Sequence, residues 1–280
     1  MSRAQLAGDP AASEGARRLL ALFFLGLVLF LYAPIAVLAV FSFNDGDVVF
    51  PLQGFTLHWY RDALTNPVLL GALRRSVIVA AVSSVIAVGL GVLAATALVR
   101  RRFAGKAAFS ALVFSPLVVP YLVFGVSLLV LFKTLAVPLS LFTVTVAHVV
   151  LSLPYTILIL VPRLERISAS LEEAARDLGA NGVRTFRWIT LPLILPAVVS
   201  AFLVAFTLSF DEYAVASFVV GRDVTYPIYL FSQFRFPRRL PQVIALAVVL
   251  MAFSAAVVIA AELIRRASER RLRAAGVVGA

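Results

Sequence analysis

The sequence of 280 residues contains no cysteine, which excludes disulfides, thiolate metal sites and cysteine nucleophiles. Charged residues are also scarce, at 14% of the chain. The two histidines, His58 and His148, belong to no HExxH motif or carboxylate cluster, so the sequence indicates no metal site. A phosphate-binding loop of the form GxxxxGK followed by Ser or Thr is missing as well. We therefore expect a protein without catalytic residues or cofactors, which relies on another chain for any ATP hydrolysis.

Long hydrophobic runs are abundant, and 62% of the residues are hydrophobic with a mean hydropathy of +1.01, far above soluble domains. About 20 apolar residues cross a bilayer as a helix, and alternating β-barrel patterns are missing. The first run is too long for a cleavable signal peptide. The sequence predicts an all-α integral membrane protein with six transmembrane helices. These are expected at residues 19–43, 77–99, 107–132, 135–161, 193–210 and 243–264.

The basic residues indicate the orientation of these spans. Of the 25 Lys and Arg residues, 17 fall on one side if the N-terminus is cytoplasmic. This asymmetry follows the positive-inside rule and accounts for the net charge of +11 without nucleic-acid binding. We therefore expect both termini in the cytoplasm. The predicted domains are a cytoplasmic tail at 1–18, a six-helix domain at 19–264 with a cytoplasmic loop at 163–192, and a basic tail at 265–280.

The cytoplasmic loop contains a short amphipathic helix in the segment LEEAARDLG. Ser170 is expected to cap it, Glu172 and Glu173 to occupy its first turn, and Gly179 to end it. At helical spacing one face carries Leu171, Ala174, Ala175 and Leu178. Helices this short are marginal in water, so the helix requires a partner surface. A helix lying on lipid headgroups would be richer in cations and in large apolar groups.

This loop resembles the EAA signature of ABC-importer permease subunits of the binding-protein-dependent, MetI-like type. The matching residues are Glu173, Ala174, Ala175, Gly179, Ile189, Leu191 and Pro192. The resemblance implies that the helix, with Glu172, is a coupling helix that docks on a separate cytoplasmic ATP-binding subunit. Glu173 would seek a cationic partner there, Ala174 and Ala175 would permit close approach, and Gly179 would permit the turn.

The resemblance also implies an assembly in the bacterial inner membrane. The permease would work by alternating access with two ATPase subunits, which bind ATP and Mg, and with a second permease subunit that we expect to be a different chain. A periplasmic or extracytoplasmic solute-binding protein would deliver the solute.

From about residue 41 to 263 the chain resembles one branch of the family, the spermidine/putrescine-type permeases. The similarity lies in PLQGFTLHWYRDALTNPVLLGALRRSVIVA and in TLSFDEYAVASFVVG. It implies a polyamine or a similar small solute. Related permeases for ferric iron, thiamine and aminophosphonates share much of these segments and remain alternatives. A secondary transporter would usually carry internal repeats or buried ionisable groups at the bilayer centre, and the sequence shows no convincing repeat, so this class is a weaker alternative. A membrane enzyme would need convergent catalytic groups, which the sequence does not display.

The second segment suggests a substrate pathway. Asp211 and Glu212 could attract a cationic amine, while Phe210 and Tyr213 could contact its methylenes or ammonium groups. The alternative is that both acids pair with surface arginines such as Arg222 or Arg235.

Other residues are expected to organise the helices. Ala87, Gly91 and Ala95 form a small-residue stripe for helix packing, and His148 is expected to form a hydrogen bond between helices. Residues 56–64 are predicted to form an interfacial helix. The prolines expected to kink or break helices are Pro116, Pro120, Pro154 and Pro196.

Overall fold

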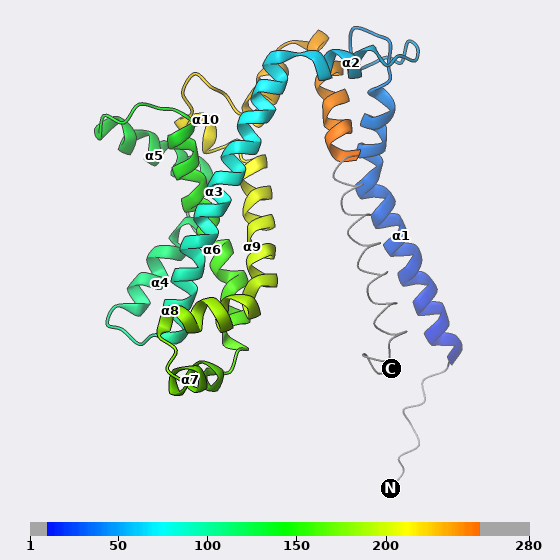
Figure 1. Cartoon of the computed structure of the whole chain (residues 1–280). Coiled ribbons are helices and arrows are strands. Elements are labelled where there is room, and N and C mark those ends of the chain that lie inside the picture. The colour runs from blue at the N-terminus through cyan, green and yellow to red at the C-terminus, as the bar shows by residue number, and fades with distance from the viewer. Residues whose placement is uncertain (1–9, 253–280) are drawn as a thin grey trace. The chain divides into compact units, whose positions relative to one another are not determined.

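The computed structural model describes residues 10–252, apart from the side chains of residues 10–14 and 169. The chain divides into two compact units, Pro67–Ser232 and a unit made of Met1–Asn66 with Gln233–Ala280. Figure 1 shows that the described part is almost entirely helical. The elements are α1 (Pro10–Phe41), α2 (His58–Thr65), α3 (Pro67–Arg100), α4 (Lys106–Phe114), η1 (Ser115–Leu117), α5 (Tyr121–Thr134), α6 (Leu141–Glu165), α7 (Ala169–Asp177), α8 (Gly182–Thr185), η2 (Phe186–Thr190), α9 (Leu191–Asp211), α10 (Ala216–Val219), α11 (Tyr226–Gln233), η3 (Pro237–Arg239) and a helix over 240–252.

The predicted all-α membrane fold is confirmed, and within residues 10–252 four helical stretches are long and apolar enough to cross a bilayer. They are Gly15–Phe41, Pro67–Arg100, Leu141–Glu165 and Gly182–Asp211. The sixth predicted span, 243–264, lies partly outside the described residues. Half of the predicted N-terminal tail and the whole C-terminal tail lie outside them as well. The fourth predicted span begins at Leu141 instead of residue 135. Residues 135–140 form a turn and an irregular segment, and Ser140 caps the start of the helix.

The third predicted span is not one straight helix. α4 and α5 are joined through η1 and bend by 108°. The break falls at the predicted prolines, since Pro116 lies in the tight turn η1 and Pro120 directly precedes α5. Proline lacks a backbone N–H and clashes with the preceding turn, which explains the interruption. Pro154 and Pro196, in contrast, lie inside the continuous helices α6 and α9.

The unit Pro67–Ser232 is built around α3, α6 and α9, which pack against one another. The predicted small-residue stripe is part of this packing, because Ala87 and Ala95 are fully buried on α3. Gly91 lies against Thr156 and Leu160 of α6, so closely that a Cβ on Gly91 would collide with Thr156. Small residues let two helix backbones approach closely where no water is available to drive association.

Two buried apolar clusters fill this bundle. The first contains Val144 and Ala147 of α6 with Val215 and Val219 near α10. The second contains Leu160 and Leu164 of α6 with residues of α3 and α9, including Val88 and Ile194. They fix the helices at both ends of the bundle.

The unit containing α1 is organised around Asn44 in the loop before α2. The Asn44 side-chain amide donates hydrogen bonds to the carbonyls of Val48, Val49 and Pro51 at 2.9 to 3.1 Å. The indole Nε1 of Trp59 donates to the Asn44 carbonyl at 2.9 Å. The predicted interfacial helix forms as α2, two residues later than expected.

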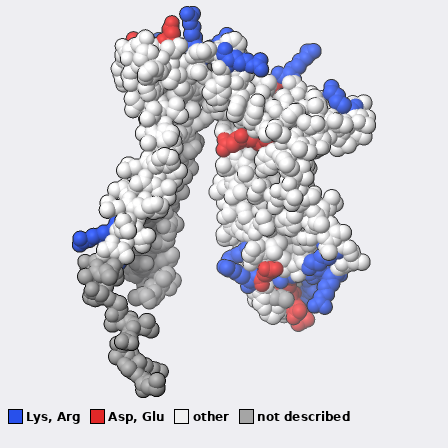
Figure 2. All heavy atoms as spheres, turned by 180° about the vertical axis from the view of Figure 1, so that it is seen from behind, with Lys and Arg blue, Asp and Glu red and all other residues white. Residues whose placement is uncertain are grey.

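Charged side chains mark the two ends of the helical bundle. In Figure 2 the bundle on the right is white over most of its length, and blue and red side chains gather at the end that carries α7. An uncharged band between charged ends is what a hydrocarbon layer requires of a protein surface.

Candidate functional site

Helix α7 begins one residue before its predicted cap. Ser168, not Ser170, is the N-cap, and its hydroxyl oxygen accepts a hydrogen bond from the Ser170 backbone N–H at 3.3 Å. Ser170 lies inside the first turn, and its own hydroxyl is 2.6 Å from that of Ser168. A capping side chain must belong to the residue just outside the helix, where the backbone is still extended.

The end of α7 confirms the prediction for Gly179. Its φ of +86° is the left-handed conformation that glycine adopts without steric cost. The Gly179 N–H donates to the Arg176 carbonyl and the Ala180 N–H donates to the Ala175 carbonyl, both at 2.9 Å. These two bonds form a Schellman motif, which stops the helix and turns the chain toward α8.

The residues of α7 divide into an inward and an outward face, and this division differs from the predicted one. Glu172 and Ala175 are buried, with exposed fractions of 9% and 8%. Leu171 and Leu178 are 49% and 90% exposed, and Glu173 is also exposed. Ala175 therefore packs against its own chain. The outward side of α7 exposes the apolar side chains of Leu171 and Leu178 together with the carboxylates of Glu173 and Asp177.

Glu172 connects α7 to two other parts of the bundle. Its carboxylate oxygen Oε1 accepts hydrogen bonds from Arg100 Nε and from Thr190 Oγ1, both at 3.1 Å. The Nη2 of Arg100 also donates to the Ile167 carbonyl at 2.9 Å. Sequence reasoning missed Arg100 and Thr190, because neither lies within helical reach of Glu172. A cavity of about 680 Å³ adjoins this cluster and is lined also by Glu173, Arg101 and Arg176.

The second half of the signature enters α9 through an irregular turn. The side chain of Asn181 caps α8 by accepting from the Arg184 N–H at 2.9 Å. η2 is a π-helical turn, in which the Leu191 N–H reaches the Phe186 carbonyl. Pro192, which follows directly, cannot supply the next N–H of a regular α-helix, and such a gap favours a wider turn. Ile189 is half-buried, and Leu191 packs on the second apolar cluster.

A second candidate site lies at the far end of α9. A cavity of about 450 Å³ opens there among α5, α6, α9 and α11. Aromatic rings form much of its lining, including Tyr213 and Phe231, which stack at 4.0 Å between ring centroids. The hydroxyls of Tyr121 and Tyr155 are 3.4 Å apart at the same cavity.

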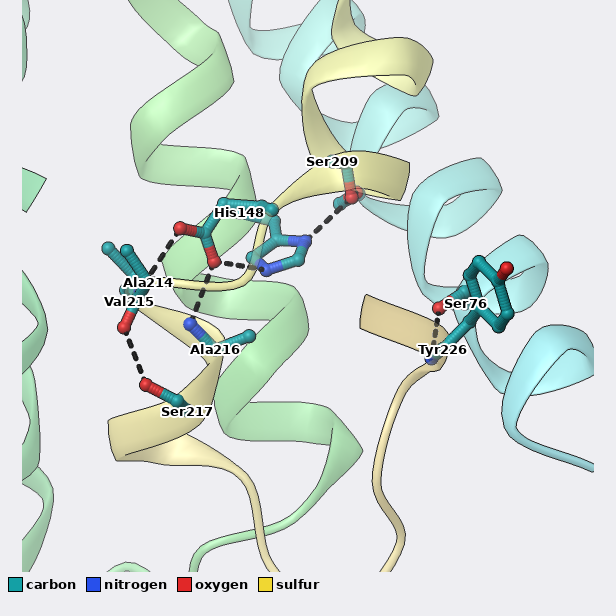
Figure 3. Close-up of polar contacts among 10 residues, drawn as sticks. Ser76, His148, Ser209, Ala214, Val215, Ala216, Ser217 and Tyr226 are labelled. Carbon is teal, nitrogen blue, oxygen red and sulfur yellow. Dashed lines mark hydrogen bonds and ion pairs between the residues drawn. The ribbon is translucent and has the colours of Figure 1, made fainter. Parts of the chain in front are cut away.

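Asp211 and Glu212 both line this cavity, but their carboxylates have different partners. Glu212 accepts hydrogen bonds from the backbone N–H groups of Val215 and Ala216, both at 2.8 Å, at the start of α10 (Figure 3). Asp211 is exposed, and its carboxylate forms no hydrogen bond or ion pair with any residue in 10–252. Only Asp211 therefore offers a carboxylate that is free to bind a ligand.

The other two predicted pathway residues lie apart from each other. Tyr213 lines the cavity, whereas Phe210 does not and instead stacks on Phe206 and Tyr226 at 6.0 and 6.3 Å. Within the described part of this unit, Arg222 forms no ion pair with either acid. Arg235, the other arginine considered as a partner, belongs to the other unit.

His148 joins α6 to α9, as predicted, and is almost completely buried. Its Nδ1 is 2.7 Å from the Ser209 hydroxyl, which is in turn 2.9 Å from the hydroxyl of Ser83 on α3 (Figure 3 shows the first contact). Its Nε2 lies 3.5 Å from Glu212 Oε2. This polar chain fixes the wall of the cavity across three helices. Among residues 10–252, no three His, Asp or Glu side chains gather as metal ligands would.

Comparisons with known proteins identify the family of the chain. Residues 87–274 match the family described as "Binding-protein-dependent transport system inner membrane component". The chain is 38% identical over 253 residues to the putrescine transport system permease protein PotI of Escherichia coli (strain K12), covering 87% of this chain and 90% of the relative. It is 39% identical over 240 residues to the spermidine/putrescine transport system permease protein PotC of Haemophilus influenzae, covering 85% and 92%.

The fold is also similar to solved transporter structures. A chain of a bacterial ABC transporter involved in the import of the acidic polysaccharide alginate has a TM-score of 0.69 at 18% identity, covering 90% of this chain and 97% of that one. A chain of an amino acid ABC transporter has a TM-score of 0.53 at 19% identity, covering 76% and 100%. The two ends of the bundle, the apolar spans and these relatives lead to one conclusion: the chain belongs to the family of inner-membrane permease components of binding-protein-dependent transport systems.

Proposed function

We propose that this permease carries a polyamine or a similar small alkylamine across the membrane, as part of an ATP-driven importer. The observation that carries the proposal is the unpaired carboxylate of Asp211 in an aromatic-lined cavity between membrane-spanning helices. The names of the relatives support the same substrate class, since they are permeases of putrescine and of spermidine/putrescine transport.

The cavity has the chemistry that an alkylammonium ion requires. A carboxylate about 4 Å from an ammonium group contributes roughly 4 kcal/mol of attraction at an effective dielectric constant near 20. Asp211 supplies this charge, and the rings of Tyr213 and Phe231 supply faces for methylene and cation-π contacts. The tyrosine hydroxyls at 121 and 155 add neutral hydrogen-bonding groups. An anionic solute would be repelled by the same carboxylates.

The partners in this proposal follow from α7. Its exposed face, with Glu173, Leu171 and Leu178, docks on a cytoplasmic ATPase subunit that binds ATP and Mg. Two such subunits act on this chain and a second, different permease chain, and a solute-binding protein delivers the substrate outside. Both termini are cytoplasmic in this arrangement. ATP-driven closure of the ATPase pair moves α7 and switches the cavity between the two sides.

The test is uptake of labelled putrescine and spermidine by cells that contain the complete transporter. We expect Asp211→Asn to reduce uptake at least tenfold at low substrate concentration, because it removes the charge and keeps the size of the side chain. The matched control is Asp223→Asn, which removes an exposed carboxylate of the same unit, 3.7 Å from Arg75. This control should keep uptake near that of the wild type.

Competition experiments distinguish the substrate classes. Unlabelled diamines should compete for uptake, whereas thiamine, ferric iron and an aminophosphonate should not. The proposal is wrong if one of these three is carried and polyamines are not. It also fails if Asp211→Asn and Asp223→Asn have the same effect while the ATPase still co-purifies with both.

A further inference from the structure

The inward face of α7 contains a charge pair that is largely buried within this chain. The side chains of Arg100 and Glu172 are only 17% and 11% exposed, and Arg100 Nε lies 3.1 Å from Glu172 Oε1. Charges removed from water are costly unless they are paired and hydrogen-bonded. Each partner here has a second bond, Glu172 from the Thr190 hydroxyl and Arg100 to the Ile167 carbonyl. The pair is therefore complete within this chain.

The four residues of this cluster come from four different segments. Arg100 is the last residue of α3, Ile167 precedes α7, Glu172 lies within α7, and Thr190 ends the π-helical turn η2. The guanidinium is planar and binds two acceptors in fixed directions, so it holds α3 and the start of α7 in one geometry. Through Thr190 the same carboxylate also reaches η2, which continues into α9.

The adjacent glutamate has a different environment. Glu173 is exposed, and its carboxylate forms no hydrogen bond or ion pair with the described residues. Neighbouring positions on a helix point about 100° apart, so one carboxylate faces the bundle and the other faces the cytoplasmic side. Glu172 and Glu173, although adjacent in the sequence, therefore have different surroundings.

We propose that the Glu172–Arg100 pair, with Thr190, is the joint that transmits movement of α7 to α3 and α9. Glu172 is a positioning residue of transport, not a contact of the ATPase. The proposal rests on the proposed function, in which a separate ATPase moves α7. Because α9 ends at Asp211, displacement at the joint reaches the cavity through a helix that is packed on α3 and α6. Helices that are packed together move as rigid bodies, so a displacement of α9 at the joint is carried along the helix to the cavity.

The first test uses the complete transporter in proteoliposomes and measures substrate transported per ATP hydrolysed. Glu172→Gln keeps the size of the side chain and an acceptor for Thr190 but removes the charge that holds Arg100. We expect the ratio of transport to hydrolysis to fall at least tenfold, while the amount of ATPase that co-purifies stays unchanged. Glu173→Gln is the matched control, and it should weaken co-purification. Equal loss of the ATPase from both variants would overturn the proposal.

The second test compares one variant with itself, before and after its two positions are linked. Because the chain has no cysteine, Arg100→Cys and Glu172→Cys introduce a single reactive pair. A short bis-methanethiosulfonate reagent, which forms a disulfide with each thiol and releases sulfinate, should restore the ratio of transport to hydrolysis in the double variant, and a reductant that cleaves both disulfides should abolish it again. An unchanged ratio before and after linking would contradict the proposal. Nucleotide-independent transport by the wild type would instead refute the proposed function, so the two failures are distinguishable.

Discussion

The imidazole Nε2 of His148 lies 3.5 Å from the carboxylate Oε2 of Glu212, and the side chains are only 1% and 7% exposed. Glu212 also accepts two backbone hydrogen bonds at the start of α10. A buried carboxylate needs several such partners, because each of them offsets part of the loss of hydration. Glu212 thus builds the wall of the cavity, and Asp211 next to it is free to bind a ligand.

The first prediction separates these two acids by their effects on stability. Glu212→Ala should destabilise the purified complex by about 2 kcal/mol, since hydrogen bonds to charged groups contribute about 1.5 to 3 kcal/mol. Asp211→Ala should change stability by less than about 0.5 kcal/mol, as exposed positions usually do. Thermal unfolding in detergent measures both variants. Equal destabilisation by both substitutions would contradict the assignment of Glu212 to structure and Asp211 to binding.

The second prediction concerns the contact between α3 and α6. Gly91→Ala should destabilise the bundle by about 1 to 3 kcal/mol, because the added Cβ collides with Thr156 and forces the two helices apart. Gly89 is the matched control on the same helix, since a Cβ there meets nothing within 4 Å. Gly89→Ala should be neutral or stabilising, by up to about 1 kcal/mol, because alanine favours helix. Denaturation of the two variants, followed by circular dichroism, compares them directly.

The third prediction concerns the end of α7. Gly179→Ala should cost about 1 kcal/mol, because an L-residue is strained at the φ of +86° that this position adopts. Gly182→Ala is the control, since Gly182 begins α8 and has open space around it. Hydrogen exchange of the α7 amides should become faster in the first variant only. Unchanged protection in both would mean that the turn does not depend on glycine.

The fourth prediction tests the orientation of the bundle with single cysteines in a chain that has none. Leu178 is 90% exposed at the end of α7, so Leu178→Cys should react with a membrane-impermeant maleimide only in inside-out vesicles. Arg222→Cys, in the loop before α11, should react only in intact spheroplasts. Labelling of Leu178→Cys from the outside would reverse the topology and remove the basis for ATPase docking.

The local signals in the sequence determined much of this fold. The apolar runs define α1, α3, α6 and α9 to within several residues, except at the N-terminal ends of α1 and α3, which both begin well before the predicted residues 19 and 77. The prediction works because a bilayer requires apolar helices of about this length. Pro116 and Pro120 mark the break between α4 and α5, and Gly179 marks the end of α7. Each of these features depends on backbone chemistry within a few residues, which a sequence displays directly.

The tertiary structure decided which face each residue presents and which distant residue it meets. Ser168 and not Ser170 caps α7, Ala175 faces inward beside Glu172, and Phe210 stays out of the cavity that Tyr121, Tyr155 and Phe231 line. The partners Arg100 and Thr190 come from other helices. Composition gives a helix in a membrane an apolar character on all sides, so periodicity does not identify its buried face. That choice depends on close packing with other helices, and here it separates the two glutamates of α7 and the two acids at the end of α9.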